Sequence, residues 1–256
     1  MSIPYLSIID EDSNTYNFES DFWIRGIGWQ TSRNVNNKSF AAGGKDISDS
    51  FLQARTVEIE GSLRADSLAA LETKVRNLQK ACLKGGSLYV SDDMVSRYLT
   101  VSNAQIDELY TGNYRMEKGL NISFLVEYPF WQSNTLTEDA NIISSAPETF
   151  YVDNSDSDFL VFPIITIEAD QGSDVPNIKL QNKTDGGMIL EYDDPLFVIG
   201  STVVINCFNG TVQRDNANSI ENLTTAKFLR LQNANNTIEY TGNDCTITYS
   251  WRKIYL

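Results

Sequence analysis

The stretch VVINCFNGTVQRD (203–215) has the pattern of a β-hairpin. Asn209-Gly210 suits a two-residue turn, because both central positions of a type I′ turn need positive φ. Such a turn pairs Cys207 with Val212, and alternation then places Cys207 on the apolar face of the hairpin. We therefore expect Cys207 to be a buried, inert core residue, because no cationic partner lies on that face to activate the thiol.

Short strand-like segments separated by turn residues make up the rest of the second half. The last of them, CTITYSWRKIYL (245–256), begins by alternating apolar and polar residues, as a strand does when one face is buried. The others are FPIITIEA (162–169), NIKLQNKTDGGMILEY (177–192) and KFLRLQNANNTIEYTG (227–242). This spacing predicts an antiparallel β-sandwich.

The first half combines strands with one expected helix. Residues 54–65 alternate with the two-residue period of a half-buried strand, whereas residues from about 66 to 84 follow the 3.6-residue period of a helix. Asp66 or Ser67 can cap the start of this helix, and Gly85 supplies a left-handed stop. Its apolar stripe consists of Leu68, Leu71, Val75, Leu78 and Cys82. We expect a mainly β protein whose N-terminal β-structure carries this one α-helix.

A polar and acidic stretch at 132–158 favours a domain boundary near residue 135. The expected domains are therefore 1–135 and 136–256. Within the first, residues 30–53 are polar and rich in Asn and Gly. Two interpretations of this segment stay open: a surface loop, or a hairpin-like arm that contacts a neighbouring subunit. Long loops without structure of their own are uncommon unless they are functional.

Charge and composition exclude several classes of function. The 256 residues carry a formal net charge of −14, with three cysteines and no histidine. The charge repels phosphate, so we expect no specific nucleic-acid binding, and no apolar run is long enough for membrane insertion. Without histidine, Ser-His-Asp or Cys-His catalysis and His-ligated metal sites are excluded. The dispersed cysteines argue against a disulfide framework or zinc site. We expect the chain to be made and assembled in a cytoplasm.

Two acidic stretches have some character of cation sites. DEDSNTYNFESD (10–21) has the carboxylate and amide spacing of an EF-hand loop, but Thr15 stands where that loop needs glycine, and no flanking helices are expected. DNSDSD (153–158) is more typical of a solvated linker. We expect no metal-binding residue in either stretch.

Carboxylate pairs and tryptophans offer the remaining candidates. Glu58 with Glu60, and Asp193 with Asp194, have the chemistry of glycosidase carboxylates, but no cleft is predicted around them. The four tryptophans are more typical of core or interface anchors than of sugar-stacking platforms. We therefore expect no catalytic or cofactor-binding residue and no enzyme activity.

The order of these segments resembles the distal tail protein family of long-tailed bacteriophages, across nearly the whole chain. The motifs that carry the resemblance are EYPFW (127–131), INCFNGTV (205–212) and an ending of the form FLRL…NNTIEYTG…YSWR. The chain departs from the family's pattern at LQNANNTI (231–238), which lacks the usual turn glycine. Asn233 is the residue that we expect to supply the left-handed conformation there.

The resemblance implies a structural protein of the virion, located at the tail tip. It implies a homo-oligomeric ring, a hexamer in this family, that joins the tail tube protein to the tail-tip or receptor-binding proteins and passes DNA through its lumen. The N-terminal domain would form the ring, with residues 30–53 as the candidate arm, and the C-terminal domain would be a galectin-like β-sandwich. An acidic chain suits such a lumen, because it repels DNA.

Two other interpretations stay open. A carbohydrate-binding β-sandwich adhesin is the main alternative, although a galectin-like fold does not by itself imply sugar binding and the chain has no histidine for a galectin-type site. A carboxylate glycosidase that uses Glu58 or Asp193 is the third.

Overall fold

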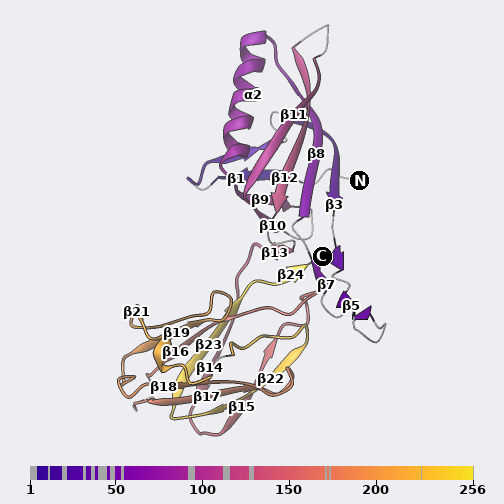
Figure 1. Cartoon of the computed structure of the whole chain (residues 1–256). Coiled ribbons are helices and arrows are strands. Elements are labelled where there is room, and N and C mark those ends of the chain that lie inside the picture. Colours follow the sequence, from indigo (N-terminus) through magenta and orange to yellow (C-terminus); the bar gives the residue numbers. More distant parts are fainter. Residues whose placement is uncertain are drawn as a thin grey trace. The chain divides into compact units, whose positions relative to one another are not determined.

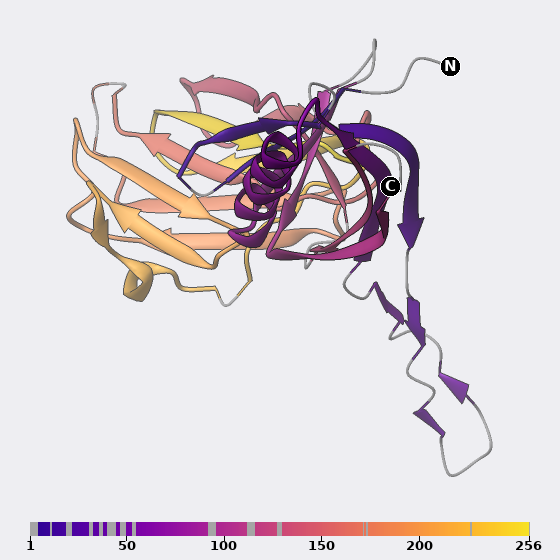
Figure 2. The same cartoon turned by 90° about the horizontal axis from the view of Figure 1, so that it is seen from above.

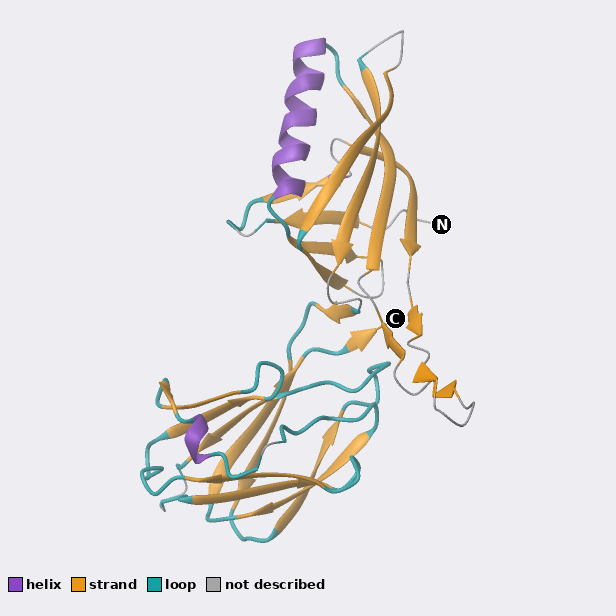
Figure 3. Ribbon diagram, viewed as in Figure 1, coloured by secondary structure: helices purple, strands orange, loops and turns teal. Residues whose placement is uncertain are grey.

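A computed structural model shows two compact units, Met1–Trp131 and Gln132–Leu256 (Figure 1). The division lies close to the predicted boundary near residue 135. The structure describes residues 5–10, 12–18, 22–30, 33–35, 38–39, 45–46, 50–52, 55–91, 96–111, 116–126, 130–170, 172, 174–225 and 227–255. Antiparallel strands dominate both units (Figure 3), which confirms the mainly β prediction.

Two antiparallel sheets build the first unit. One has the strand order β2-β1-β9-β10 and comprises β1 (Tyr5–Ile9), β2 (Thr15–Asn17), β9 (Gly86–Ser91) and β10 (Ser96–Val101). The other has the order β11-β12-β8-β3 and comprises β3 (Phe22–Gln30), β8 (Arg55–Arg64), β11 (Asn103–Thr111) and β12 (Glu117–Val126). Strict alternation buries one face of β12, through Leu120, Ile122, Phe124 and Val126.

The helix α2 (Leu68–Leu83) packs against strands of both sheets, β8 and β11 of one and β1 and β2 of the other (Figure 2). Its predicted start is confirmed, because Ser67 Oγ accepts the Ala70 N–H at 3.2 Å. Its predicted stop is also confirmed, because Gly85 has a φ of +73°. A Cβ at Gly85 would lie 2.3 Å from the Ser102 carbonyl oxygen, so the tight turn into β9 needs glycine.

The predicted stripe of α2 is buried except at its first member. Leu71, Val75, Leu78 and Cys82 are buried, as expected. Leu68, in contrast, is 62% exposed, so this member of the stripe does not lie in the core. Helical side chains lean towards the N-terminus and cover the preceding turn. Leu68 is the first helical residue, so no turn of α2 lies beneath its side chain.

Residues 30–53 contain regular structure where they are described. β4 (Arg33–Val35) pairs with β7 (Ser50–Leu52), and β5 (Lys38–Ser39) pairs with β6 (Lys45–Asp46). Both pairs are antiparallel, so the segment folds back on itself between β3 and β8. The Gly43-Gly44 pair lies outside the described residues.

The second unit also contains two antiparallel sheets. The larger, in the order β14-β23-β16-β19-β20-β21, comprises β14 (Thr137–Ile143), β16 (Ile164–Glu168), β19 (Thr202–Asn206), β20 (Thr211–Arg214), β21 (Ala217–Asn218) and β23 (Cys245–Trp251). The smaller, in the order β15-β22-β17-β18, comprises β15 (Glu148–Asp153), β17 (Asn177–Asn182), β18 (Met188–Asp193) and β22 (Asn235–Thr241). Shorter elements are β13 (Trp131–Ser133), β24 (Ile254–Tyr255) and the 3-10 helix η1 (Ile220–Asn222).

The apolar faces of these strands form the core of the second unit. The predicted alternation of β23 is confirmed, since Cys245, Ile247, Tyr249 and Trp251 are buried. β19 buries Val203 and Ile205 in the same way.

The hairpin β19–β20 exists, but its predicted register was wrong. Ile205, and not Cys207, pairs with Val212. The reason is the side chain of Asn206, whose Oδ1 accepts the N–H groups of Phe208 and Asn209, each at 3.0 Å. This Asx-type turn holds four residues, 207–210, where a type I′ turn would hold two.

The register error leaves the predicted faces unchanged. The pairing shifts by two residues, and the side-chain period of a strand is also two. Cys207 is therefore buried as predicted, with 4% exposure. Its N–H donates to the Pro163 carbonyl at 3.1 Å.

The predicted conformation of Asn233 was also wrong. The described non-glycine residues with positive φ are Ser13, Met116, Asp215 and Asn216, and Asn233 is not among them. The turn is held instead by Asn236, whose Oδ1 accepts the Gln232 N–H at 2.8 Å and whose Nδ2 donates to the Ala234 carbonyl at 2.8 Å. A buried side-chain amide thus replaces the backbone geometry that a glycine would provide.

Candidate functional site

The three cysteines are buried thiols without disulfides. Burial raises the pKa of Cys82 and of Cys207 to about 12, and that of Cys245 to about 11. Because the thiolate is the reactive species, none of the three is a nucleophile at neutral pH.

At the start of the acidic stretch 10–21, the described residues up to Asn14 form a turn held by the side chain of Asp10. Asp10 Oδ1 accepts the Asp12 N–H at 3.0 Å and the Asn14 N–H at 2.8 Å. The pKa of Asp10 is lowered most by a hydrogen bond from the Asn14 side chain, whose Nδ2 donates to Asp10 Oδ2 at 3.0 Å, and further by these two backbone bonds. Asp21 lies outside the described residues. Over the described part of the chain, no group of three or more Cys, Asp or Glu side chains has a metal-binding arrangement.

The stretch 153–158 is likewise engaged within the fold. Asn154 is fully buried, and its Oδ1 accepts the Trp251 Nε1–H at 2.9 Å. Asp153 accepts the Ser155 N–H at 2.9 Å, and Asp156 pairs with Lys253 at 2.7 Å. These contacts give this stretch a structural role.

The carboxylate pairs do not form a catalytic arrangement. Glu58 and Glu60 share one face of β8, and each lies opposite a glycine of β3. Asp193 and Asp194 are separated by burial, since Asp193 is exposed and Asp194 is 1% exposed. Neither pair places an acid and a base around a shared cleft.

The tryptophans have different environments. Trp131 and Trp251 are buried, as expected for anchors. Trp23 is 56% exposed, with the Arg64 guanidinium 4.6 Å from its ring centre. The side chain of Trp29 lies outside the described residues.

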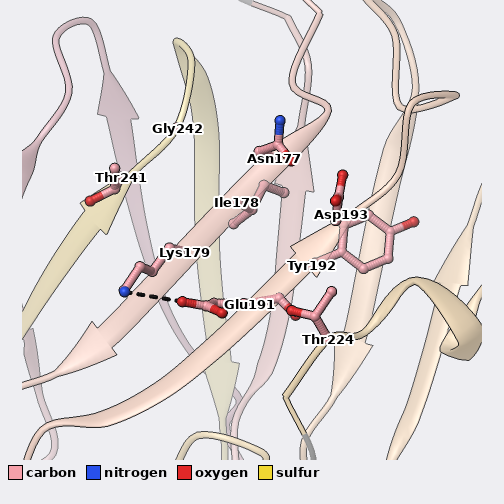
Figure 4. A pocket seen from close by; sticks show the side chains of 9 residues that line it. All are labelled: Asn177, Ile178, Lys179, Glu191, Tyr192, Asp193, Thr224, Thr241 and Gly242. Carbon is pink, nitrogen blue, oxygen red and sulfur yellow. Dashed lines mark hydrogen bonds and ion pairs between the residues drawn. The ribbon is translucent and has the colours of Figure 1, made fainter.

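One depression, with a volume of about 460 Å³, lies over β17 and β18 (Figure 4). Its lining residues are Asn177, Ile178, Lys179, Glu191, Tyr192, Asp193, Thr224, Thr241 and Gly242. Lys179 and Glu191 form an ion pair at 3.0 Å across it. Tyr192, its only aromatic lining residue, is 1% exposed and therefore offers no stacking surface. The depression can form hydrogen bonds, but it has no group with catalytic geometry.

The lining residue Tyr192 belongs to a set of polar side chains that we call the carboxylate network, with Asp194, Arg214 and Ser219 as its other members. Tyr192, Asp194 and Ser219 are buried, and the Arg214 side chain is 23% exposed. Asp194 Oδ2 accepts the Tyr192 hydroxyl at 2.6 Å and lies 3.3 Å from Ser219 Oγ, and it pairs with Arg214. Burial and the bond to Asp194 raise the pKa of Tyr192 to about 12. Burial alone would raise the pKa of Asp194, but the bonds from Tyr192, the Leu196 N–H and Arg214 outweigh it and lower that pKa.

A second set, Asn154, Asn182 and Asn236, forms what we call the amide network; all three are fully buried. Asn236 Oδ1 accepts the Asn182 Nδ2–H at 3.0 Å, and Asn154 and Asn236 both donate to the Gln232 carbonyl. Sequence reasoning missed both networks, because partners lie far apart along the chain. The Asp194-Pro195 dipeptide is a turn signal that could have drawn attention to the first.

Comparison with known proteins places the fold. Residues 156–255 match the family model described as siphovirus-type tail component, C-terminal domain. No curated protein sequence matches the chain. No described helix has both the length and the apolar character needed to cross a membrane.

Two solved structures share the fold over nearly the whole chain. One is the Dit protein of phage SPP1, described as a paradigm of the hub adsorption apparatus in phages that infect Gram-positive bacteria. It covers 100% of both chains at 13% identity, with a TM-score of 0.71. The other is a chain of the phage P2 baseplate in its activated, calcium-bound conformation, with 98% of both chains covered at 10% identity and a TM-score of 0.51. The predicted resemblance to phage distal tail proteins is confirmed.

Proposed function

We propose that this chain is a structural, non-enzymatic component of a phage tail tip, and that it acts as a homo-oligomeric ring. The ring is a hexamer that joins the tail tube to the tail-tip or receptor-binding proteins, and its lumen passes DNA. The observation that carries the proposal is the fold likeness to SPP1 Dit over the full length of both chains, together with the tail-component match of residues 156–255.

The charge and chemistry of the chain support this role. A net charge of −14 keeps a passage non-adhesive for DNA. The buried thiols and the separated carboxylates leave the described residues without an arranged nucleophile or acid–base pair. The domain roles follow the expected division: residues 1–135 form the ring, and residues 136–256 form the outer sandwich.

The purified full-length chain tests the ring directly. We expect size-exclusion chromatography with light scattering to give the mass of six subunits, and electron microscopy to show six-fold rings. Because some rings close only on their tube, particles reconstituted with the tail tube protein are the second sample. A chain that stays monomeric alone and fails to bind tube ends would contradict the proposal.

The arm within residues 30–53 has its own test. Deletion of residues 34–50 removes the β5–β6 pair and most of the β4–β7 pair, and we expect a folded monomer without rings. A variant that carries a Gly/Ser linker of equal length in place of 34–50 separates the loss of side chains from the loss of chain length. A hexamer that persists in native mass spectrometry of both variants would show that the arm does not hold the ring.

The adhesin alternative has less support, because the depression of Figure 4 lacks an exposed aromatic ring among its lining residues. Glycan-array binding by the full chain that is lost in Lys179→Ala, but retained in Lys183→Ala, would favour it.

A further inference from the structure

The connection from β18 to β19 exposes an unusual amount of apolar surface. Leu196, Val198 and Ile199 are 64%, 41% and 55% exposed. Single exposed apolar residues are common on protein surfaces, but three within four consecutive residues form a concentrated patch. We call residues 195–200 the apolar loop.

The apolar loop is held in one conformation by buried groups. Phe197, between the exposed residues, is fully buried. The carboxylate network fixes the start of the loop, since Asp194 Oδ1 accepts the Leu196 N–H at 2.9 Å. Its end is fixed by Asp174, which accepts the Ile199 N–H at 2.9 Å, and by the Ala169 carbonyl, which accepts the Gly200 N–H at 2.8 Å. A loop ordered in advance loses little conformational entropy when it binds.

The same network brings a fourth apolar residue to this end of the unit. Ile220 is 37% exposed and begins η1, the short helix drawn in purple in Figure 3. It follows Ser219, whose Oγ lies 3.3 Å from Asp194 Oδ2. Ile220 and Leu196 are therefore both tied to the carboxylate of Asp194.

The surroundings of the apolar loop are strongly acidic. The segments that meet here are 168–170 with 174–176, 193–202 and 214–222. Their acidic residues are Glu168, Asp170, Asp174, Asp193, Asp194, Asp215 and Glu221. Asp194 is buried, so the other six, which are exposed, make up the acidic rim. Their only basic residue is Arg214, which pairs with Asp194. An apolar centre with an acidic rim is complementary to an apolar centre with a basic rim.

We propose that the apolar loop is a docking element for a different protein, one that presents an apolar socket rimmed by Lys and Arg side chains. The aliphatic side chains of residues 196, 198 and 199 enter the socket, and the carboxylates around them pair with the basic rim. A second copy of this chain that docks through the same loop is disfavoured as the occupant, because it would bring the same acidic rim. The proposal does not depend on ring formation.

Synthetic amphipathic peptides test this chemistry on the full-length chain. We would measure, by fluorescence anisotropy, the binding of a labelled Leu/Lys peptide, a Leu/Glu peptide with the same apolar face, and a Ser/Lys peptide with the same charge. The double variant Leu196→Ser/Ile199→Ser removes the apolar contact. Its matched control is Leu136→Ser/Ile142→Ser, which changes a Leu and an Ile that are 43% and 65% exposed elsewhere in the unit.

We expect the Leu/Lys peptide to bind most tightly, and its Kd to rise about tenfold or more in the loop variant but not in the control. If the Leu/Lys peptide bound the loop variant as tightly as it binds the wild-type chain, the proposal would be overturned, because binding would then be general attraction to an acidic protein. If the Leu/Glu peptide bound as tightly as the Leu/Lys peptide, the inference that the partner has a basic rim would be overturned. Self-association that only the loop variant abolishes, seen by light scattering, would overturn the choice of partner in favour of a second copy.

Discussion

The amide network and the carboxylate network hold two turns of the same β-sandwich by different chemistry. The amide network uses neutral side chains and fixes the turn before β22, where no large apolar residue is exposed between 229 and 236. The carboxylate network uses a buried carboxylate paired with the partly exposed Arg214, and it fixes the start of the apolar loop. Neutral amides satisfy buried backbone groups at any pH, whereas a buried carboxylate needs its charge and its partners. The turn held by amides exposes no large apolar side chain, whereas the loop held by the carboxylate exposes three.

Among the substitutions that test this comparison, Asn236→Ala is expected to have the largest effect on stability. It leaves the Asn182 Nδ2, the Gln232 N–H and the carbonyl groups around Asn236 without their partner in the core. We expect the free energy of unfolding to fall by about 3 kcal/mol in chemical denaturation. Asn235→Ala is the matched control, because Asn235 is exposed. An equal loss in both variants would mean that the network does not hold the turn.

Asp194→Asn should have the next largest effect. The substitution keeps the shape of the side chain but leaves Arg214 without its counter-charge and disturbs the hydrogen bond to Tyr192. We expect a loss of about 2 kcal/mol at pH 7 in the same measurement. Asp193→Asn, at an exposed neighbouring position, should change the stability by less than about 0.5 kcal/mol.

The pH dependence of stability should differ between Asp194→Asn, which disrupts the carboxylate network, and Asn236→Ala, which disrupts the amide network. Folding lowers the pKa of Asp194, so the native state binds its proton less tightly than the unfolded chain does. Its contribution is therefore complete above the ordinary value of 3.8 and is lost as the pH falls through the lower folded pKa. The stability gap between the wild-type chain and Asp194→Asn should shrink below that value, whereas the gap to Asn236→Ala should stay constant. If both stability gaps changed with pH in the same way, the two networks would not differ in their dependence on charge.

Asn206→Ala should have the smallest effect and tests a third turn, that of the β19–β20 hairpin. It removes the oxygen that accepts two backbone N–H groups, but this turn is solvent-accessible, so water can replace the bonds. We expect a loss of about 1 kcal/mol. Asn209→Ala should cost less than about 0.5 kcal/mol, because Asn209 does not adopt positive φ. A larger loss of stability in Asn209→Ala than in Asn206→Ala would instead support the type I′ turn and the register predicted from the sequence.

Sequence patterns predicted the parts of this protein that repeat locally. The period of two identified β8 and β23, and the period of 3.6, with Ser67 and Gly85 at its ends, identified α2. The buried state of Cys207 followed even with the wrong register, because a shift of two residues conserves the faces of a strand. The order of these segments was enough to suggest the distal tail protein family, which the match of residues 156–255 and the fold likeness support.

Tertiary structure alone decided which polar residues are buried and what they hold. Asn154, Asn182 and Asn236 look like ordinary turn residues in sequence, and Asp194 looks like its neighbour Asp193. Their roles depend on partners that lie as many as 97 positions away along the chain, as in the bond between Asn154 and Trp251. Local propensity carries no information about such partners, because only the packing of two sheets brings them together and removes the water that would otherwise compete for them. The apolar loop became visible for the same reason: its sequence, PLFVIG, suggests a buried strand, and the fold buries only Phe197 of its large side chains.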